Sequence, residues 1–147
     1  WHARAGSKNA VRLYRLVHDY FTAKSLDTII WAYHTTQRAG ALIDYYPGDE
    51  YVDVIGKSAY GTGLIFTEYD WALEKKKTLG KVIWWAELGL RGESEPPVDC
   101  FNVLRKLETS FPELAGFVFW SDDPFYNVVG NLNGPSFMAD PKIVTIK

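Results

Sequence analysis

The sequence predicts an α/β fold built from parallel βα units. Three observations predict it: four short runs of β-branched and aromatic residues, helical periodicity in the segments between them, and Gly or Pro at several junctions. Regular alternation of helix and strand is typical of right-handed βαβ units around a parallel sheet. With 147 residues, 47% of them hydrophobic, the chain can bury a sizeable core and has the length of one domain. No repeat or linker divides residues 1–147, which we treat as a single segment.

Each predicted element has its own signal in the sequence. Apolar positions at helical spacing predict the helices, and nearly uncharged runs of β-branched and aromatic residues predict strands covered on both faces. Ser7 is a suitable N-cap for the first helix, Pro47 and Gly48 end the second, and Gly80 ends the third. No period is evident after Pro124. The predicted order is helix 7–24, strand 28–34, short helix 42–46, strand 52–56, helix 67–79, strand 81–86, helix 98–110 and strand 115–120.

Charge and cysteine content argue against several classes of function. Lys and Arg total 16 against 18 for Asp and Glu, and a net charge of −2 argues against nucleic acid or an anionic membrane as the main partner. The single cysteine, Cys100, excludes an internal disulfide framework and a zinc site made from cysteines of one chain. Apolar runs are too short for a membrane span, and no Gly-rich phosphate loop is present. We therefore expect no cofactor and no metal.

The candidate site residues follow from the parallel sheet, because such sheets place their sites at the carboxyl ends of the strands. Glu87 comes directly after apolar and small residues, so its carboxylate should lie at the mouth of the sheet. A charge there is unfavourable unless it is paired or used in chemistry. The hydroxyl of Tyr60 can donate a hydrogen bond that holds this carboxylate ionised and oriented. Tyr33, His34 and Trp120 also lie at strand ends.

Each candidate also has a purely structural interpretation. Glu87 can equally be a solvated acid at a strand end, and Tyr60 an aromatic plug. Trp120 alone is more often a core residue, although the polar residues after it favour the rim. For His34, a satisfied imidazole is the simpler interpretation, with a partner of sugar hydroxyls as the alternative. The 6 tryptophans favour a carbohydrate site, because flat indole rings stack on the C–H faces of sugars.

Four segments in order along the chain resemble the C-terminal half of glycoside hydrolase family 26. The resemblance covers nearly the whole chain, from the helix after the fourth barrel strand to the end of the domain. Its segments are residues 46–56 followed by Ser58-Ala59-Tyr60, residues 81–89 with Trp84-Trp85-Ala86-Glu87, residues 117–120, and the closing residues 140–145.

The resemblance implies a (β/α)8 barrel and a retaining glycosidase, since this family consists mostly of β-mannanases with some lichenases and β-1,3-xylanases. It implies that Glu87 is the nucleophile at the end of the seventh strand and that Tyr60, from the sixth, is its hydrogen-bonding neighbour. Trp120, from the eighth, would be the stacking platform, and Trp1 matches an aromatic that lines the cleft after the fourth strand. The acid/base of the family is a Glu in a His-Glu pair at the end of the fourth strand, and this chain begins just beyond it.

Length independently predicts half of such a barrel. A (β/α)8 barrel takes about 250 residues and eight strands, whereas 147 residues with four predicted strands make half of one, and the resemblance implies that these are strands five to eight. Two unpaired parallel edges would remain, so we expect an N-terminal half-barrel, a second copy or more of the same chain to cover them.

The expected function is hydrolysis of a β-linked polysaccharide, β-1,4-mannan in the first place, by a secreted endo-glycosidase that is inactive as this segment alone. Two alternatives stay open at this stage. One is a non-catalytic carbohydrate-binding or structural half-barrel. The other is an unrelated α/β domain in which Glu87 is coincidental.

Overall fold

A computed structural model describes residues 2–36, 38–61, 64–120 and 122–144 of the chain. The elements, in chain order, are α1 (His2–Ala23), β1 (Ala32–Thr35), α2 (Ala41–Asp44), the 3₁₀ turn η1 (Asp49–Tyr51), β2 (Val54–Tyr60), α3 (Tyr69–Leu79), β3 (Val82–Gly89), α4 (Cys100–Ser110), β4 (Gly116–Phe119) and α5 (Gly134–Met138).

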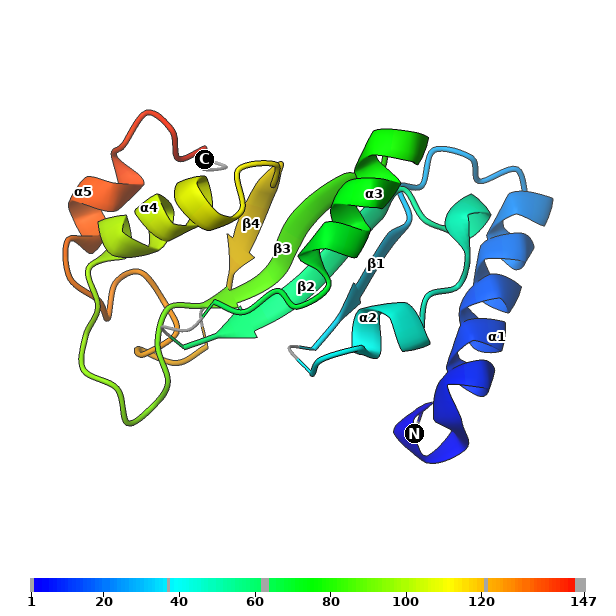
Figure 1. Ribbon diagram of the computed structural model, residues 1–147, viewed down its shortest axis with the longest axis horizontal. Helices are drawn as coiled ribbons and strands as arrows, with labels where there is room; N and C mark the ends of the chain where they lie inside the picture. Colours follow the sequence, from blue (N-terminus) through cyan, green and yellow to red (C-terminus); the bar gives the residue numbers. More distant parts are fainter. Residues whose placement is uncertain (1, 37, 62–63, 121, 145–147) are drawn as a thin grey trace.

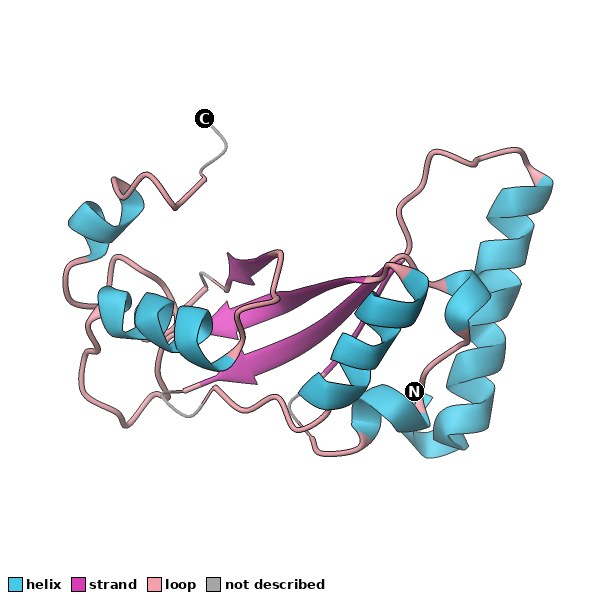
Figure 2. Cartoon of the chain, turned by 45° about the horizontal axis from the view of Figure 1, so that its top comes forward, coloured by secondary structure: helices cyan, strands magenta, loops and turns pink. Residues whose placement is uncertain are grey.

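All four strands are parallel and form one sheet in the order β1-β2-β3-β4, so each strand pairs with the next one along the chain. Helices α3 and α4 lie against one face of the sheet, and α1 and α2 lie at its β1 end (Figures 1 and 2). The predicted α/β architecture of parallel βα units is thereby confirmed.

The first strand differs from the prediction in its start and its burial. It begins at Ala32 rather than at residue 28. Before it, the Trp31 N–H donates to the Asp53 carboxylate at 2.8 Å, and the Trp31 carbonyl accepts from the Asp53 N–H at 2.8 Å. The expectation that both faces are covered is wrong for this strand, because Ala32 and His34 are exposed. As an edge strand, β1 pairs only with β2 among the described elements.

Helix boundaries were predicted to within a few residues where a cap or a glycine marks them. Gly6 has a φ of 78° and interrupts α1 directly before Ser7, so the regular part of this helix begins where predicted. Asp99 caps α4 by accepting a hydrogen bond from the Phe101 N–H at 2.9 Å, one residue after the predicted start. The short α5 was not predicted, because five residues carry too little periodicity to be recognised.

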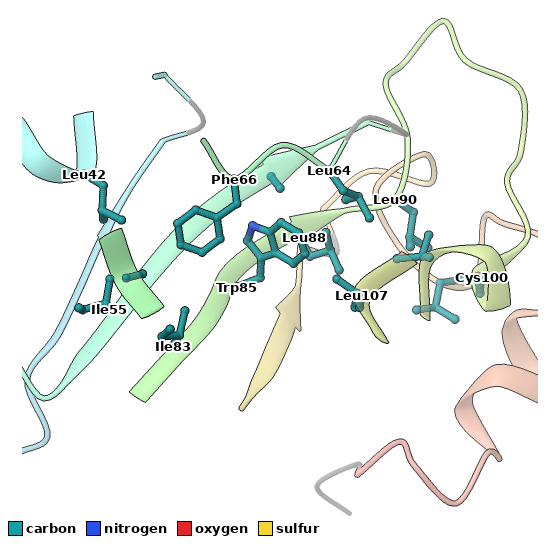
Figure 3. Close-up of a cluster of buried hydrophobic side chains, with 14 of the residues drawn as sticks. Leu42, Ile55, Leu64, Phe66, Ile83, Trp85, Leu88, Leu90, Cys100 and Leu107 are labelled. Atoms are coloured by element: carbon teal, nitrogen blue, oxygen red, sulfur yellow. The ribbon is translucent and has the colours of Figure 1, made fainter. Parts of the chain in front are cut away.

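The core lies between the sheet and the helices α3 and α4. Trp85 is its centre: the side chain is fully buried, and its ring lies 4.7 Å from the ring of Phe111, centroid to centroid. Trp85 and Ile83 share this helix-facing side because alternate residues of a strand point to the same face. The close-up in Figure 3 shows the row of side chains Leu42, Ile55, Leu64, Phe66, Ile83, Trp85, Leu88, Leu90, Cys100 and Leu107.

A buried ion pair also lies on the helix-facing side of the sheet. Lys57 on β2 is fully buried, and its Nζ donates to Oε2 of Glu68, which is also buried. The Thr67 hydroxyl donates to the same oxygen at 2.8 Å. Burial alone would raise the pKa of Glu68, but the hydrogen bonds from Lys57 and Thr67 outweigh it and hold this pKa below its usual range. The charged pair therefore fixes the segment before α3 against the middle of β2.

We predict that removing either partner of this pair destabilises the protein strongly. Lys57→Met leaves a buried carboxylate without its cation and Glu68→Gln leaves a buried ammonium without its anion, so each should lower the free energy of unfolding by about 3–5 kcal/mol. The double replacement Lys57→Met, Glu68→Leu should recover most of that loss. Urea unfolding of the three variants checks this. Because the Glu68 pKa is lowered in the folded protein, its contribution should be lost as pH falls through that value. An exposed ion pair contributes at most about 1 kcal/mol to stability. If the free energy of unfolding of each single variant lies within about 1 kcal/mol of that of the parent, the prediction is wrong.

The sheet has an open side at β1. A cleft of about 610 Å³ lies along this strand and is lined by residues of α1, β1 and α2 and of the segment between β1 and α2. Large apolar side chains are also exposed on α1 and before β1: Leu16 and Tyr20 are each more than half exposed, and Ile30 is 73% exposed. None of the helices in the described part of the chain is long and apolar enough to cross a membrane.

Candidate active site

One extra residue in β3 turns Glu87 onto the open face of the sheet. Three steps along β3 from Trp85 to Leu88 match only two steps along β4, from Phe117 to Phe119. The register with β2 shows the same irregularity, since Lys57 pairs with Trp85 and the next residue, Ser58, pairs with Glu87.

Strict alternation would place Glu87 on the same face as the buried Trp85, because the two residues are two positions apart. The bulge at Ala86 shifts the alternation by one residue. The Glu87 side chain therefore leaves the core side, while Leu88 takes the core position.

Two hydroxyl groups of β2 hold one oxygen of the Glu87 carboxylate. Tyr60 Oη donates to Glu87 Oε2 at 2.7 Å, and Ser58 Oγ donates to the same oxygen at 3.1 Å. The two donors are two residues apart on β2 and so point to the same face. Among the described residues, none donates a hydrogen bond to the other oxygen, Oε1. The arrangement orients the half-buried carboxylate and leaves one oxygen for another partner.

Tyr60 is held in its neutral, donating form. Burial raises the pKa of its phenol well above the usual value, and the hydrogen bond to Glu87 and the negative charge of that residue raise it further. A phenol that stays protonated across the neutral range can donate to a carboxylate continuously. The predicted pairing of Tyr60 with Glu87 thus corresponds to a short hydrogen bond in the structure.

His34 lies on the same face of the sheet as Glu87 but on the edge strand β1, and Trp120 follows β4, the strand beside β3. The backbone N–H of Trp120 donates to the Leu88 carbonyl at 3.0 Å, which places this residue beside the end of β3, and its side chain is 38% exposed. His34 is exposed on β1, opposite Gly56, where an added Cβ would lie 2.9 Å from the Cβ of His34. Both positions are compatible with a ligand on this face.

The structure does not bring Tyr33 to this face. Its side chain is buried on the helix side, where its hydroxyl donates to the Leu42 carbonyl at 3.3 Å and its ring contacts the rings of Tyr14 and Tyr46. Tyr33 and His34 are adjacent in a strand and must point to opposite faces. Tyr33 therefore does not lie beside Glu87 as its place at a strand end had suggested, and it lines the cleft along β1 instead; Trp1 lies outside the described residues.

Ser58 follows the predicted strand 52–56 and so belongs to the strand-end candidates, but no role in holding Glu87 was predicted for it, although its spacing could have indicated one. It lies two residues before Tyr60, just beyond the predicted strand 52–56, and the strand observed in the structure continues to Tyr60, so the two hydroxyls share a face. Within the described part of the chain, no group of three or more His, Cys, Asp or Glu side chains is placed to hold a metal ion. The group that the described residues offer for chemistry is the oriented carboxylate of Glu87.

A parallel βα sheet that presents a carboxylate and aromatic side chains at the carboxyl ends of its strands has the architecture of (β/α)8-barrel enzymes. The comparisons with known proteins agree. The family model described as glycosyl hydrolase family 26 matches residues 1–132. The chain belongs to this family.

The curated relatives are bacterial mannanases. A mannan endo-1,4-β-mannosidase of Bacillus subtilis is 29% identical over 112 residues, which are 75% of this chain and 30% of the relative. Mannan endo-1,4-β-mannosidase A and B of Caldalkalibacillus mannanilyticus is 24% identical over 115 residues, 76% of this chain and 22% of the relative. The chain thus spans about a third or less of the length of these relatives.

Solved structures of similar proteins confirm the fold. The Bacillus subtilis mannanase BCman superposes with a TM-score of 0.72 at 22% identity, over 88% of this chain and 37% of that protein. The catalytic domain of an endo-β-1,4-mannanase from Bacillus sp. JAMB-750 superposes with a TM-score of 0.68 at 18% identity, over 95% of this chain and 45% of that domain. The chain therefore has the fold of part of such a barrel.

We predict that Glu87→Gln lowers the phenol pKa of Tyr60, because the substitution removes the negative charge beside it. Burial remains the larger cause, so the pKa should fall only part of the way to its ordinary value. A pH titration of ¹³C-labelled tyrosine by NMR measures this, with Tyr60→Phe to assign the resonance. An unchanged Tyr60 pKa in Glu87→Gln would mean that the two side chains do not interact in solution.

Proposed function

We propose that the chain is the C-terminal part of the catalytic barrel of a retaining endo-glycosidase and that Glu87 is its nucleophile. The observation that supports this is the carboxylate with its two oxygens in different roles: Oε2 accepts from Tyr60 and Ser58, and Oε1 accepts from neither. Hydrolysis with retention requires such a carboxylate, oriented on one face of the sugar and with one oxygen free to attack.

In the proposed reaction, Glu87 Oε1 forms a bond to the anomeric carbon while the bond from that carbon to the leaving oxygen breaks. A second carboxyl group protonates the leaving oxygen and then, as a carboxylate, takes a proton from the water that hydrolyses the glycosyl ester. We place this second group in the N-terminal half of the barrel, at a distance of about 5–5.5 Å from Glu87, as retention requires. The isolated 147-residue segment should therefore be inactive.

The substrate we propose is a β-linked polysaccharide, with β-1,4-mannan the first to test. Support comes from the relatives, whose names are mannan endo-1,4-β-mannosidases. Support also comes from the partly exposed indole of Trp120 next to the end of β3, because an indole ring can stack on a sugar face. His34 is suited to a sugar hydroxyl on the same face, and the family resemblance gives Trp1 a further place along the cleft.

The partner we propose is the other half of the barrel, with residues 1–147 as a single segment of it. The free edge of β1 and the cleft along it offer unpaired backbone groups and apolar surface that a further parallel strand would cover. The 30% coverage of the Bacillus subtilis relative leaves ample length for such a half. Because polymeric mannan cannot enter a cell intact, we also propose that the assembled enzyme is extracellular.

We predict that Glu87→Gln lowers kcat/KM on mannan by about 10³-fold or more in the assembled barrel, because the nucleophile is lost. Glu93→Gln is the matched control, since Glu93 is exposed on the loop after β3 and should leave kcat/KM unchanged. Release of reducing sugar from mannan, lichenan and β-1,3-xylan gives the rates. Hydrolysis that survives Glu87→Gln would refute the nucleophile. Glycan binding without hydrolysis in every wild-type assembly would support a non-catalytic half-barrel instead.

We predict further that ¹H NMR of the first product shows the β anomer, because two displacements at one carbon retain its configuration. Tyr60→Phe should lower kcat by roughly 10- to 100-fold through the lost hydrogen bond to a charged group. Trp120→Ala should instead raise KM and change kcat little, because it removes a surface on which a sugar ring can stack. An α anomer as first product would exclude a covalent intermediate on Glu87 and would contradict the proposal.

A further inference from the structure

The side chain of Tyr60 is held in place by a tyrosine from the segment that follows β4. The rings of Tyr60 and Tyr126 lie 5.2 Å apart, centroid to centroid, at an interplanar angle of 60°. Both rings lie directly over Gly89, the last residue of β3. An added Cβ there would lie 2.5 Å from Cδ1 of Tyr60 and 2.7 Å from Cδ1 of Tyr126. The two rings thus occupy the space that any larger residue at position 89 would need.

Backbone hydrogen bonds also join the segments that carry these three residues. The Leu90 N–H donates to the Tyr126 carbonyl at 3.1 Å, and the Gly61 N–H donates to the Gly89 carbonyl at 3.1 Å. The ends of β2 and β3 and the segment carrying Tyr126 are therefore fastened together where the Tyr60 hydroxyl reaches Glu87. A shift of Tyr126 would remove the ring that limits the movement of Tyr60.

The segment carrying Tyr126 is itself anchored by a buried amide. Asn131 is 8% exposed, and its Oδ1 accepts from the Val98 N–H at 3.0 Å. Its Nδ2 donates to the carbonyls of Asn127 at 2.7 Å and Phe125 at 3.2 Å. These bonds tie the turn around Tyr126 to the residues that precede α4. The contact with Tyr60 is therefore part of a closed hydrogen-bonded structure rather than of a loose loop.

We propose that Tyr126 is a positioning residue of the active site that acts on Glu87 through Tyr60. Its ring and the bare backbone of Gly89 confine Tyr60 to the orientation in which its hydroxyl meets Glu87 Oε2. The proposal rests on the proposed function insofar as Glu87 is the nucleophile, but the mechanical link between Tyr126 and Tyr60 does not. The chain offers a way to test each part separately.

The first test is a double-mutant cycle in the assembled enzyme. Tyr126→Leu should lower kcat on mannan by roughly tenfold with KM changed by no more than about twofold, while Tyr126→Phe, which keeps the ring, should have wild-type kinetics. In a Tyr60→Phe background, Tyr126→Leu should have little further effect, since the hydrogen bond that it protects is already absent. Val129→Ala, at an 89% exposed position in the same segment, is the control and should change nothing.

Three outcomes of the cycle would overturn the proposal. Equal loss in Tyr126→Phe would assign the effect to the Tyr126 hydroxyl. A rise in KM alone would make Tyr126 a sugar contact. A full additional loss in the Tyr60→Phe background would show that Tyr126 does not act through Tyr60.

The second test needs no activity and separates this proposal from the proposed function. The phenol pKa of Tyr60, titrated by NMR of ¹³C-labelled tyrosine, should fall in Tyr126→Leu because the covering ring is gone. It should fall less in Tyr126→Phe, which keeps the ring and removes only the Tyr126 hydroxyl, whose ionisation also raises the Tyr60 pKa. Gly89→Ala should shift the Tyr60 resonance as well, because its Cβ displaces the ring. If mannan hydrolysis is absent but these shifts occur, the proposed function fails and the positioning link stands. If hydrolysis is normal and Tyr60 does not respond, the positioning role is refuted.

Discussion

The extra residue in β3 is the constraint on which the site depends. A strand with strict alternation would carry Trp85 and Glu87 into the same apolar layer, where the carboxylate would be buried without a cation. Because of the bulge at Ala86, Trp85 and Leu88 both point into the core although they are three residues apart. Glu87, between them, points to the open face. The bulge thus moves the carboxylate of Glu87 out of the apolar layer and toward the hydroxyls that orient it.

The neighbouring strand is built to match this bulge. On β2, Ser58 and Tyr60 direct their hydroxyls to Glu87, while Lys57 and Ala59 lie on the opposite, buried face. Lys57 is paired with Glu68 directly behind the position of Ser58. The donors that orient Glu87 therefore extend from a strand whose opposite face is fixed by a buried ion pair. Rigid support behind a functional side chain is what holds it within the narrow geometry that catalysis needs.

Much of the fold could be predicted from local sequence, because each helix and strand carries its own period or its own cap. The position of Glu87 at a strand end was also predicted, but from its place in the sequence and not from the face on which it lies. The bulge has no sequence signature, since Ala86 fits a strand or a bulge equally well. Tyr33 illustrates the same point: it lies at a strand end, but its side chain points to the opposite face from that of its neighbour His34 and is buried. The contact of Tyr126 with Tyr60 could not be predicted from the sequence. The two residues are 66 positions apart (126 − 60), and Tyr126 lies in a segment without periodicity.

The described residues that contact Glu87 and Tyr60 all come from the part of the chain between β2 and the segment after β4. Both hydroxyls that bind its carboxylate come from β2, the strand immediately next to β3, and the ring that confines Tyr60 comes from the segment after β4. Every described contact that orients this carboxylate therefore belongs to one continuous piece of chain. At the edge strand β1, by contrast, the described residues leave a cleft that is lined by residues of α1, β1 and α2. One side of the proposed site is thus already ordered. If the proposed function holds, the second acid group and the choice of sugar depend on residues outside this ordered side.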